Sequence, residues 1–361
     1  MAKQFIPGLE LSGYLFNEAL QPLLADHFPR LIYAAARLDR GSEVMGFDTP
    51  MSMDHGWGPK MTLFLNEKDY QKYNTPLDDF FALHLPFTIH GYPTNFKGPL
   101  MDGGQMQLKE DYPITHGITI TTPERFFQAT LHVDITQAIT ARDWLTFPHQ
   151  RLRTIRAGRI YHDGLGRLAE IRARFHWYPR DLWLYLLASQ WQRISQDSPF
   201  LGRTGVVGDD LGSRLLAGRL ITDLMNLAFL MEQEYAPYWK WFGAAFQQLS
   251  LAKDLTPSFQ AVLQSSDWKA REHHLTEAYL QVIEAHNALH LTDPIPVQVH
   301  PFYQRPFLVP PTGQIMAALR GQITDPEILA LPAGLGNINQ ISDNTDLLDN
   351  LDHGEKLRVL Y

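Results

Sequence analysis

The 361-residue sequence contains no cysteine. This absence excludes disulfides, a thiolate nucleophile, and zinc or iron–sulfur centres held by cysteine. The sequence also lacks an uninterrupted apolar run near the roughly 20 residues that a membrane span needs. Residues 1–16, MAKQFIPGLELSGYLF, lack the basic start and apolar core of a secretory signal. We therefore expect a cytoplasmic, bacterial-type protein without a membrane partner.

Positive charge is in short supply. The formal net charge of −8 argues against an extended surface that binds nucleic acid by neutralising phosphates. At 45% hydrophobic and 19% charged residues, the sequence can bury a core and lacks the bias of disordered chains. Its length exceeds the size at which single cores stop growing, so we expect two packed domains.

The order of predicted elements indicates an α+β fold. Apolar residues at helical spacing predict a helix over residues 10–28, which the proline of HFPR ends. Apolar or alternating runs predict strands over residues 31–38, 60–65 and 117–122, and a helix opens at PERFFQATL. Between residues 69 and 117, prolines and glycines predict short strands and long loops.

The later part of the chain has long helical patterns. Trp183, Leu187 and Trp191 recur at i, i+4 and i+8, which predicts a buried stripe on one helix. Asp209 or Asp210 is expected to cap the next helix. These helices imply an all-α bundle.

We therefore expect three regions. Residues 1–170 form an α/β domain with a mixed β-sheet and flanking helices, and residues 171–290 form a helical bundle. The break between them is expected near residues 163–179. Residues 291–361, which are rich in proline and then polar, form a C-terminal extension that packs on both domains.

The stretch GSEVMGFDTPMSMDHGWGPK has some of the residue types that nucleotidyl transfer needs. A Gly-Ser turn after a strand, here Gly41 and Ser42, offers backbone amides and a hydroxyl to phosphate oxygens. A carboxylate ahead of the next strand, here Asp54, fixes a divalent cation in line with attack. Carboxylate and water oxygens are the ligands that Mg²⁺ prefers.

This pattern resembles the signature of the polymerase-β-type nucleotidyltransferase superfamily, and it is distantly similar to the kanamycin nucleotidyltransferase group. A longer resemblance is to an uncharacterised bacterial family of nucleotidyltransferase-like proteins, domain of unknown function 4037. Besides the stretch above, the residues that carry it are FIPGLELS, ARDWLTFPHQRL, YPRDLWLYLLASQWQRI, GDDLGSR and YAPYWKWFG. These segments span most of the chain.

The resemblance implies a nucleotidyltransferase-like first domain that binds a nucleoside triphosphate, most simply ATP, with Mg²⁺. The implied reaction transfers a nucleoside monophosphate to a small-molecule or protein acceptor. The implied site residues are Asp54 as the catalytic acid and metal ligand, Gly41 and Ser42 at the nucleotide, and Lys60 at a phosphate, where the family has arginine. Beside these, Asp48 in the same loop could serve as a substitute metal ligand, and His55 next to Asp54 could ligate the metal or contact the nucleotide base. Ser42, Lys60 and His55 also have structural interpretations, as a turn serine, a solvated lysine and a structural histidine.

The sequence departs from the family pattern where metal ligands are expected. The family reads Asp-His-Asp-Trp-Gly-Pro-Arg, whereas this chain has Gly56 in place of the second Asp and Lys60 in place of the Arg. The third acid of the superfamily aligns near Thr119. The alternative is therefore a catalytically degenerate pseudoenzyme that binds a nucleotide or docks a partner, because a single carboxylate holds Mg²⁺ weakly.

Other residues offer weaker candidates. The acids that could replace the missing carboxylates are Glu43, Asp48, Asp102 and Asp134. The sequence favours a turn or surface role for each of them. Asp209 or Asp210 could act as a base, as the similarity to the kanamycin group suggests. The neighbours His273 and His274 point about 100° apart on a helix, so we expect no shared zinc ion there.

Overall fold

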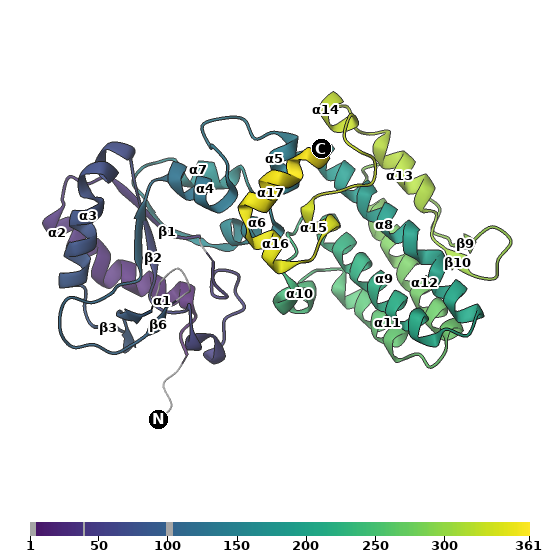
Figure 1. Ribbon diagram of the computed structural model, residues 1–361, viewed down its shortest axis with the longest axis horizontal. Helices are drawn as coiled ribbons and strands as arrows, with labels where there is room; N and C mark the ends of the chain where they lie inside the picture. The colour runs from purple at the N-terminus through teal and green to yellow at the C-terminus, as the bar shows by residue number, and fades with distance from the viewer. Residues whose placement is uncertain (1–4, 39, 99–103) are drawn as a thin grey trace. The chain divides into compact units, whose positions relative to one another are not determined.

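The computed structural model describes residues 5–38, 40–98 and 104–361 (Figure 1). These residues form an α+β structure with a small mixed sheet and a large helical C-terminal region, as the sequence predicts. In the described parts of the chain, none of the helices combines the length and apolar character that a membrane crossing requires.

The chain divides into two compact units. Unit 1 comprises Met1–Ile139 and Arg151–His176, and unit 2 comprises Thr140–Gln150 and Trp177–Tyr361. The final division lies between His176 and Trp177, and the whole C-terminal extension belongs to unit 2.

Unit 1 is built on a four-stranded mixed sheet. Its strands are β1 (Tyr33–Arg37), β2 (Met61–Leu65), β7 (Ile118–Thr121) and β8 (Arg159–Asp163), in the order β7-β2-β1-β8. β1 is antiparallel to β2 and β8, whereas β2 is parallel to β7. All five residues of β2 are buried, because its sequence MTLFL packs on both faces. The three strands that the sequence predicts are confirmed.

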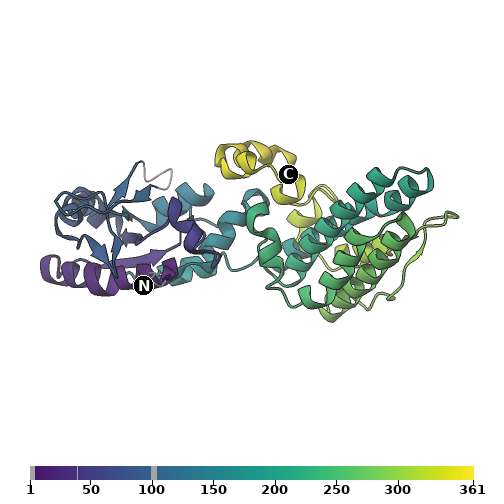
Figure 2. The same cartoon turned by 90° about the horizontal axis from the view of Figure 1, so that it is seen from below.

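Helices cover both faces of this sheet. The helices are α1 (Gly8–Leu15), α2 (Gln21–His27), α3 (Glu67–His84) and α4 (Pro123–Leu131). Leu63 and Leu65 of β2 belong to one core cluster with apolar residues of α1, α2 and α3. Phe64 points the other way, and its ring centroid lies 5.3 Å from that of Phe126 in α4. Figure 2 shows α1 and α2, in purple, along one side of the sheet.

The predicted N-terminal helix is confirmed, with one irregularity. It begins at Gly8, two residues earlier than predicted, and a π-helical segment η1 (Phe16–Leu20) joins α1 to α2. It ends at His27, because Phe28 precedes a proline and leaves the helical conformation.

The prediction of only short strands and loops after residue 69 is wrong at its start. α3 runs through Pro76 for 18 residues, and the Asn66 side chain caps it by accepting from the Asp69 amide at 2.9 Å. Proline lowers helical propensity in a sequence pattern, but buried Leu77 and Phe81 anchor this helix. The other elements of unit 1 are η2 (Pro50–Asp54), β3 (Thr88–Ile89), β4 (Tyr92–Pro93), β5 (Phe96–Lys97), β6 (Gln105–Met106) and α7 (Leu168–Ala173).

Unit 2 is a helical bundle. Its long helices are α8 (Arg180–Val206), α9 (Asp210–Met231), α11 (Ala252–Gln264), α12 (Trp268–Ala288) and α13 (Thr312–Arg320). α9, α12 and α13 all pack against α8. Trp183, Leu187 and Trp191 are buried, which confirms the predicted core stripe. Asp209 caps α9, as predicted, by accepting from the Gly212 amide at 2.8 Å.

Shorter elements complete unit 2. They are α5 (Ala141–Thr146), α10 (Trp239–Phe246), β9 (His300–Pro301), β10 (Leu308–Val309), α14 (Pro326–Leu329), α15 (Ile338–Ile341), α16 (Thr345–Asp349), α17 (Leu351–Leu357) and η4 (Arg358–Leu360). α6 (His149–Ala157) starts in unit 2 and continues into unit 1. An ion pair between Arg358 and Asp143 joins the C-terminal end to α5.

Candidate functional site

The turn after β1 is held by a buried ion pair. The Nη2 atom of Arg37 donates to the Glu43 carboxylate at 2.8 Å and to the Arg40 carbonyl at 2.7 Å. The side chains of Arg37 and Glu43 are only 5% and 1% exposed. Each charge has lost its water, so the removal of either partner would leave an uncompensated buried charge. Gly41 and Ser42 lie between the two partners in the sequence, next to this buried pair.

Gly41 has a conformation that favours glycine. Its φ is +149°, and a Cβ at this position would lie 2.3 Å from the Glu43 Oε2 atom. Ser42 is half-buried, and its carbonyl accepts from the Phe47 amide at 2.9 Å to close the turn. The backbone conformation and the close contact with Glu43 therefore explain why this position is a glycine.

Asp48 has a structural role in unit 1. Its Oδ2 atom accepts from the Gly8 amide at 2.7 Å and from the Trp57 indole nitrogen at 2.9 Å. This carboxylate therefore satisfies the first backbone amide of α1, where the helix dipole favours negative charge. Sequence reasoning placed Asp48 at the metal, because nothing local indicated a partner forty residues away. Asp102, another acid considered above, lies outside the described residues.

Asp54 is the exposed acid of the loop. It ends η2, its side chain is 65% exposed, and its Oδ1 atom lies 2.9 Å from the His55 Nδ1 atom. Partial burial raises the pKa of the Asp54 carboxyl, but the hydrogen bond and charge of His55 outweigh this effect and lower it overall. Asp54 is therefore ionised at neutral pH and accessible to a cation.

Gly56 and Lys60 lie between Asp54 and β2, in a segment held by hydrogen bonds. Gly56 has φ +69°, and its amide donates to the Gly104 carbonyl at 2.8 Å. Lys60 donates to the Gly56 carbonyl at 2.8 Å, and its ammonium group lies 5.1 Å from the centre of the Phe96 ring. The left-handed backbone supplies a structural reason for glycine at position 56.

Thr119 lies in β7, directly opposite Thr62 of β2 in the parallel register. The resemblance assigns the third acid to this position, but the residue there and the residue opposite it on β2 are both threonines.

The remaining candidate acids have local partners. Asp134 accepts two bonds from Thr136, at 2.9 Å from its amide and 2.7 Å from its hydroxyl. Asp210 forms ion pairs with Arg214 and Arg271. The hydrogen bonds and charges of these arginines hold the pKa of the Asp210 carboxyl below its ordinary value, which is unfavourable for a general base.

The histidine neighbours on α12 are closer together than their spacing suggests. The ligand atoms of His273, His274 and Glu277 all lie within 4.8 Å of one another. The expectation that His273 and His274 point too far apart to share an ion is therefore corrected, because their ligand atoms lie close enough to do so. Glu277, one turn further on, lies 3.5 Å from His273 and 3.0 Å from His274. A carboxylate between two imidazoles explains the arrangement without a metal.

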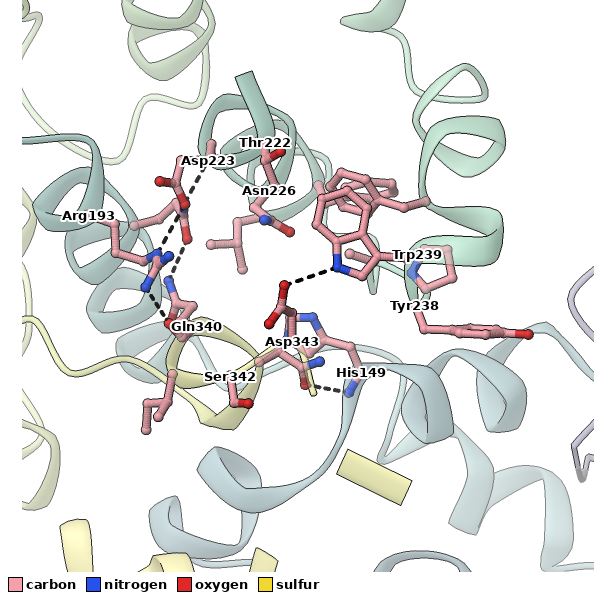
Figure 3. A pocket seen from close by; sticks show the side chains of 18 of the residues that line it. His149, Arg193, Thr222, Asp223, Asn226, Tyr238, Trp239, Gln340, Ser342 and Asp343 are labelled. Carbon is pink, nitrogen blue, oxygen red and sulfur yellow. Dashed lines mark hydrogen bonds and ion pairs between the residues drawn. The ribbon is translucent and has the colours of Figure 1, made fainter. Parts of the chain in front are cut away.

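Unit 2 contains a cavity of about 570 Å³ that sequence reasoning missed (Figure 3). It is lined by His149, Gln190, Arg193, Arg219, Thr222, Asp223, Asn226, Phe229, Leu230, Ala236, Pro237, Tyr238, Trp239, Phe242, Asn339, Gln340, Ile341, Ser342, Asp343 and Leu348. Its volume is in the range of small-molecule sites. A sequence signal near it was the aromatic string YAPYWKWFG. Trp239 in this string is 55% exposed.

One wall of the cavity is a network around Asp223. Its Oδ1 atom accepts from Gln190 at 3.1 Å and from the Arg193 Nε atom at 3.0 Å. Arg193 also donates to the backbone carbonyl of Gln340 at 2.6 Å. The side-chain Nε2 atom of Gln340 donates to the Gln190 Oε1 atom at 3.0 Å. These bonds tie the segment around α15 to α8 and α9.

A second network fixes His149. The Asn337 Oδ1 atom accepts from the backbone N–H of Gln340, which fixes the orientation of the Asn337 side chain. Its Nδ2 atom therefore faces the Tyr178 hydroxyl and the His149 Nε2 atom, which lies 2.7 Å away. The imidazole must accept this bond, which makes it neutral with its proton on Nδ1. Burial lowers the pKa of His149 to about 4.

The model of a domain of unknown function (DUF4037) matches residues 144–242. The match supports a resemblance to an uncharacterised family, and it contains fourteen of the twenty residues that line the cavity. The Gly41–Lys60 loop lies outside it. No curated protein and no solved structure matches the chain.

Proposed function

We propose that unit 1 is a nucleotidyltransferase-like module that binds a nucleoside triphosphate at the Gly41–Lys60 loop. The observation that carries the proposal is the Gly41–Ser42 turn that follows β1 and packs against the buried Arg37–Glu43 pair, together with the exposed carboxylate of Asp54 ahead of β2. A Gly-Ser turn and a serine hydroxyl suit phosphate oxygens, and Lys60, directly ahead of β2, adds a positive charge.

Mg²⁺ is the cation that this chemistry uses, and the residues present fit it only in part. Asp54 offers one accessible carboxylate, whereas an Asp48 oxygen is committed to Gly8 and Trp57. When bound with the nucleotide, Mg²⁺ would neutralise phosphate charge as a monophosphate passes to a small-molecule or protein acceptor. The role of this chain's own residues is to orient the phosphates.

A second candidate is nucleotide binding without transfer. Two observations favour it: Thr119 occupies the position expected for the third acid, and the left-handed backbone at Gly56 suits glycine rather than the expected acid. With one carboxylate, the module would sense a nucleotide or present a docking surface.

Label transfer separates the two candidates. The protein is incubated with Mg²⁺, each α-labelled nucleoside triphosphate and candidate acceptors. A transferase deposits label on an acceptor, and Asp54→Ala is expected to lower the rate at least 100-fold because the metal loses its protein ligand. Asp134→Ala, which removes another exposed acid of unit 1, should leave the rate unchanged. Nucleotide binding without label transfer supports the second candidate.

Gly56→Asp is expected to strengthen Mg²⁺–nucleotide binding about tenfold, because a second carboxylate would stand two residues from the first. Aspartate tolerates the left-handed backbone at a cost of about 1 kcal/mol. The matched control is Gly56→Asn, which carries the same backbone cost without the charge. Equal affinities of the two variants in a calorimetric titration would mean that this loop is not arranged around a metal.

A further inference from the structure

In the cavity of unit 2, the two arginines of the lining form ion pairs, whereas one carboxylate forms none within the described part of the chain. Arg193 pairs with Asp223 at 3.0 Å, and Arg219 pairs with Asp197 at 2.5 Å. Asp223 and Asp197 are buried, so each arginine is bound to a carboxylate that has no alternative solvation. Both arginines of the lining are therefore already paired with a carboxylate of the protein, although the Arg219 side chain is 58% exposed.

Asp343 is the charge that remains. It is exposed at the cavity, and its Oδ2 atom accepts from the neutral Trp239 indole nitrogen at 3.2 Å. Within the described ranges, no lysine, arginine or histidine forms an ion pair with it. His149 adds no positive charge at neutral pH, because its ring accepts from Asn337.

Aromatic surface lies beside this carboxylate. The Trp239 ring is 5.3 Å from that of Phe242, which is in turn 5.5 Å from Phe229. Figure 3 shows the side chains of Asn226, Trp239 and Asp343 pointing into the cavity. Aromatic faces attract cations, and the Asn226 amide oxygen can accept from an N–H group.

We propose that this cavity binds a small organic molecule that carries a protonated amine on an aromatic or apolar body. The ammonium group lies at Asp343 and Asn226, and the body packs against Trp239 and its neighbouring rings. All these residues belong to unit 2. The inference is therefore independent of the proposed nucleotide site.

Three probes with one ring and different head groups test the charge preference. They are phenethylamine, the neutral phenethyl alcohol and the anionic hydrocinnamate, each titrated into the full-length protein by NMR or calorimetry. Phenethylamine is expected to bind at least tenfold more tightly than the alcohol, and hydrocinnamate more weakly still. Equal binding of amine and carboxylate, tighter binding of the carboxylate, or no binding of the amine would overturn the proposal.

Variants locate the site. Asp343→Asn is expected to weaken phenethylamine binding about tenfold and to leave the alcohol unaffected, whereas Trp239→Ala weakens both. Asp346→Asn, which neutralises another exposed acid of the same segment outside the lining, is the matched control. An equal loss of phenethylamine affinity in Asp346→Asn and Asp343→Asn would mean that the amine is attracted only by the overall negative charge of this segment, which would contradict the proposal. Because Asp343 is exposed, the variant should keep the wild-type melting temperature.

Discussion

Glu43→Ala is expected to lower the free energy of unfolding of unit 1 by about 3–5 kcal/mol. The substitution leaves the Arg37 guanidinium buried without the carboxylate that faces it at 2.8 Å. It also opens space beside Gly8 and Gly41, both of which pack directly on the Glu43 side chain. The turn that presents Ser42 should loosen with it, so nucleotide binding is expected to fall as well.

The matched control is Glu67→Ala, which breaks an exposed ion pair with Arg125 in the same unit. Exposed pairs contribute little because water screens both charges, so this variant should lose much less stability than Glu43→Ala. Hydrogen exchange of the β1 and β2 amides along a urea titration measures both, since these strands lie in unit 1. Similar losses in the two variants would show that the Arg37–Glu43 pair does not hold the turn.

Acidification from pH 7 to pH 4 is expected to remove about 3 kcal/mol of stability through His149 alone. Its pKa falls from 6.5 to about 4 on folding because the ring is buried. The unfolded chain therefore binds a proton more readily than the folded protein. The contribution is fully present above pH 6.5 and is lost as the pH falls towards 4.

Protonation of His149 would set two N–H donors against each other. Protonation would place an N–H on the His149 Nε2 atom, which now accepts from Asn337 at 2.7 Å. His149→Gln keeps an acceptor but cannot titrate, so its stability should change less between pH 7 and pH 4, by about 3 kcal/mol. The pKa of His286 is also lowered to about 4 by burial, and it titrates in both proteins, so it cancels. Parallel pH profiles for wild type and variant would contradict the assignment.

Much of the fold could be predicted because its signals are local. The runs that became β1, β2 and β7 are apolar over the length of a strand, and Trp183, Leu187 and Trp191 have the spacing of a buried helical face. The interior of α3 escaped prediction because Pro76 is locally unfavourable, while the contacts that compensate for it come from the rest of unit 1.

The sites were predictable only in part, for the same reason. Gly41 could be identified because a turn of this kind restricts one position to glycine. The structural role of Asp48 could not, because its partner Gly8 lies forty residues away. The cavity of unit 2 was invisible to pattern analysis, since its walls combine His149 with residues near Gln340. Distant segments meet there only after folding.

A calorimetric titration of ATP with Mg²⁺ into the full-length protein tests the central claim most directly. We predict saturable binding at one site per chain, a rise in melting temperature as the nucleotide exceeds its Kd, and about tenfold weaker binding for Ser42→Ala. Absence of heat and of a melting shift with every nucleoside triphosphate would contradict the claim. So would an affinity that Ser42→Ala leaves unchanged.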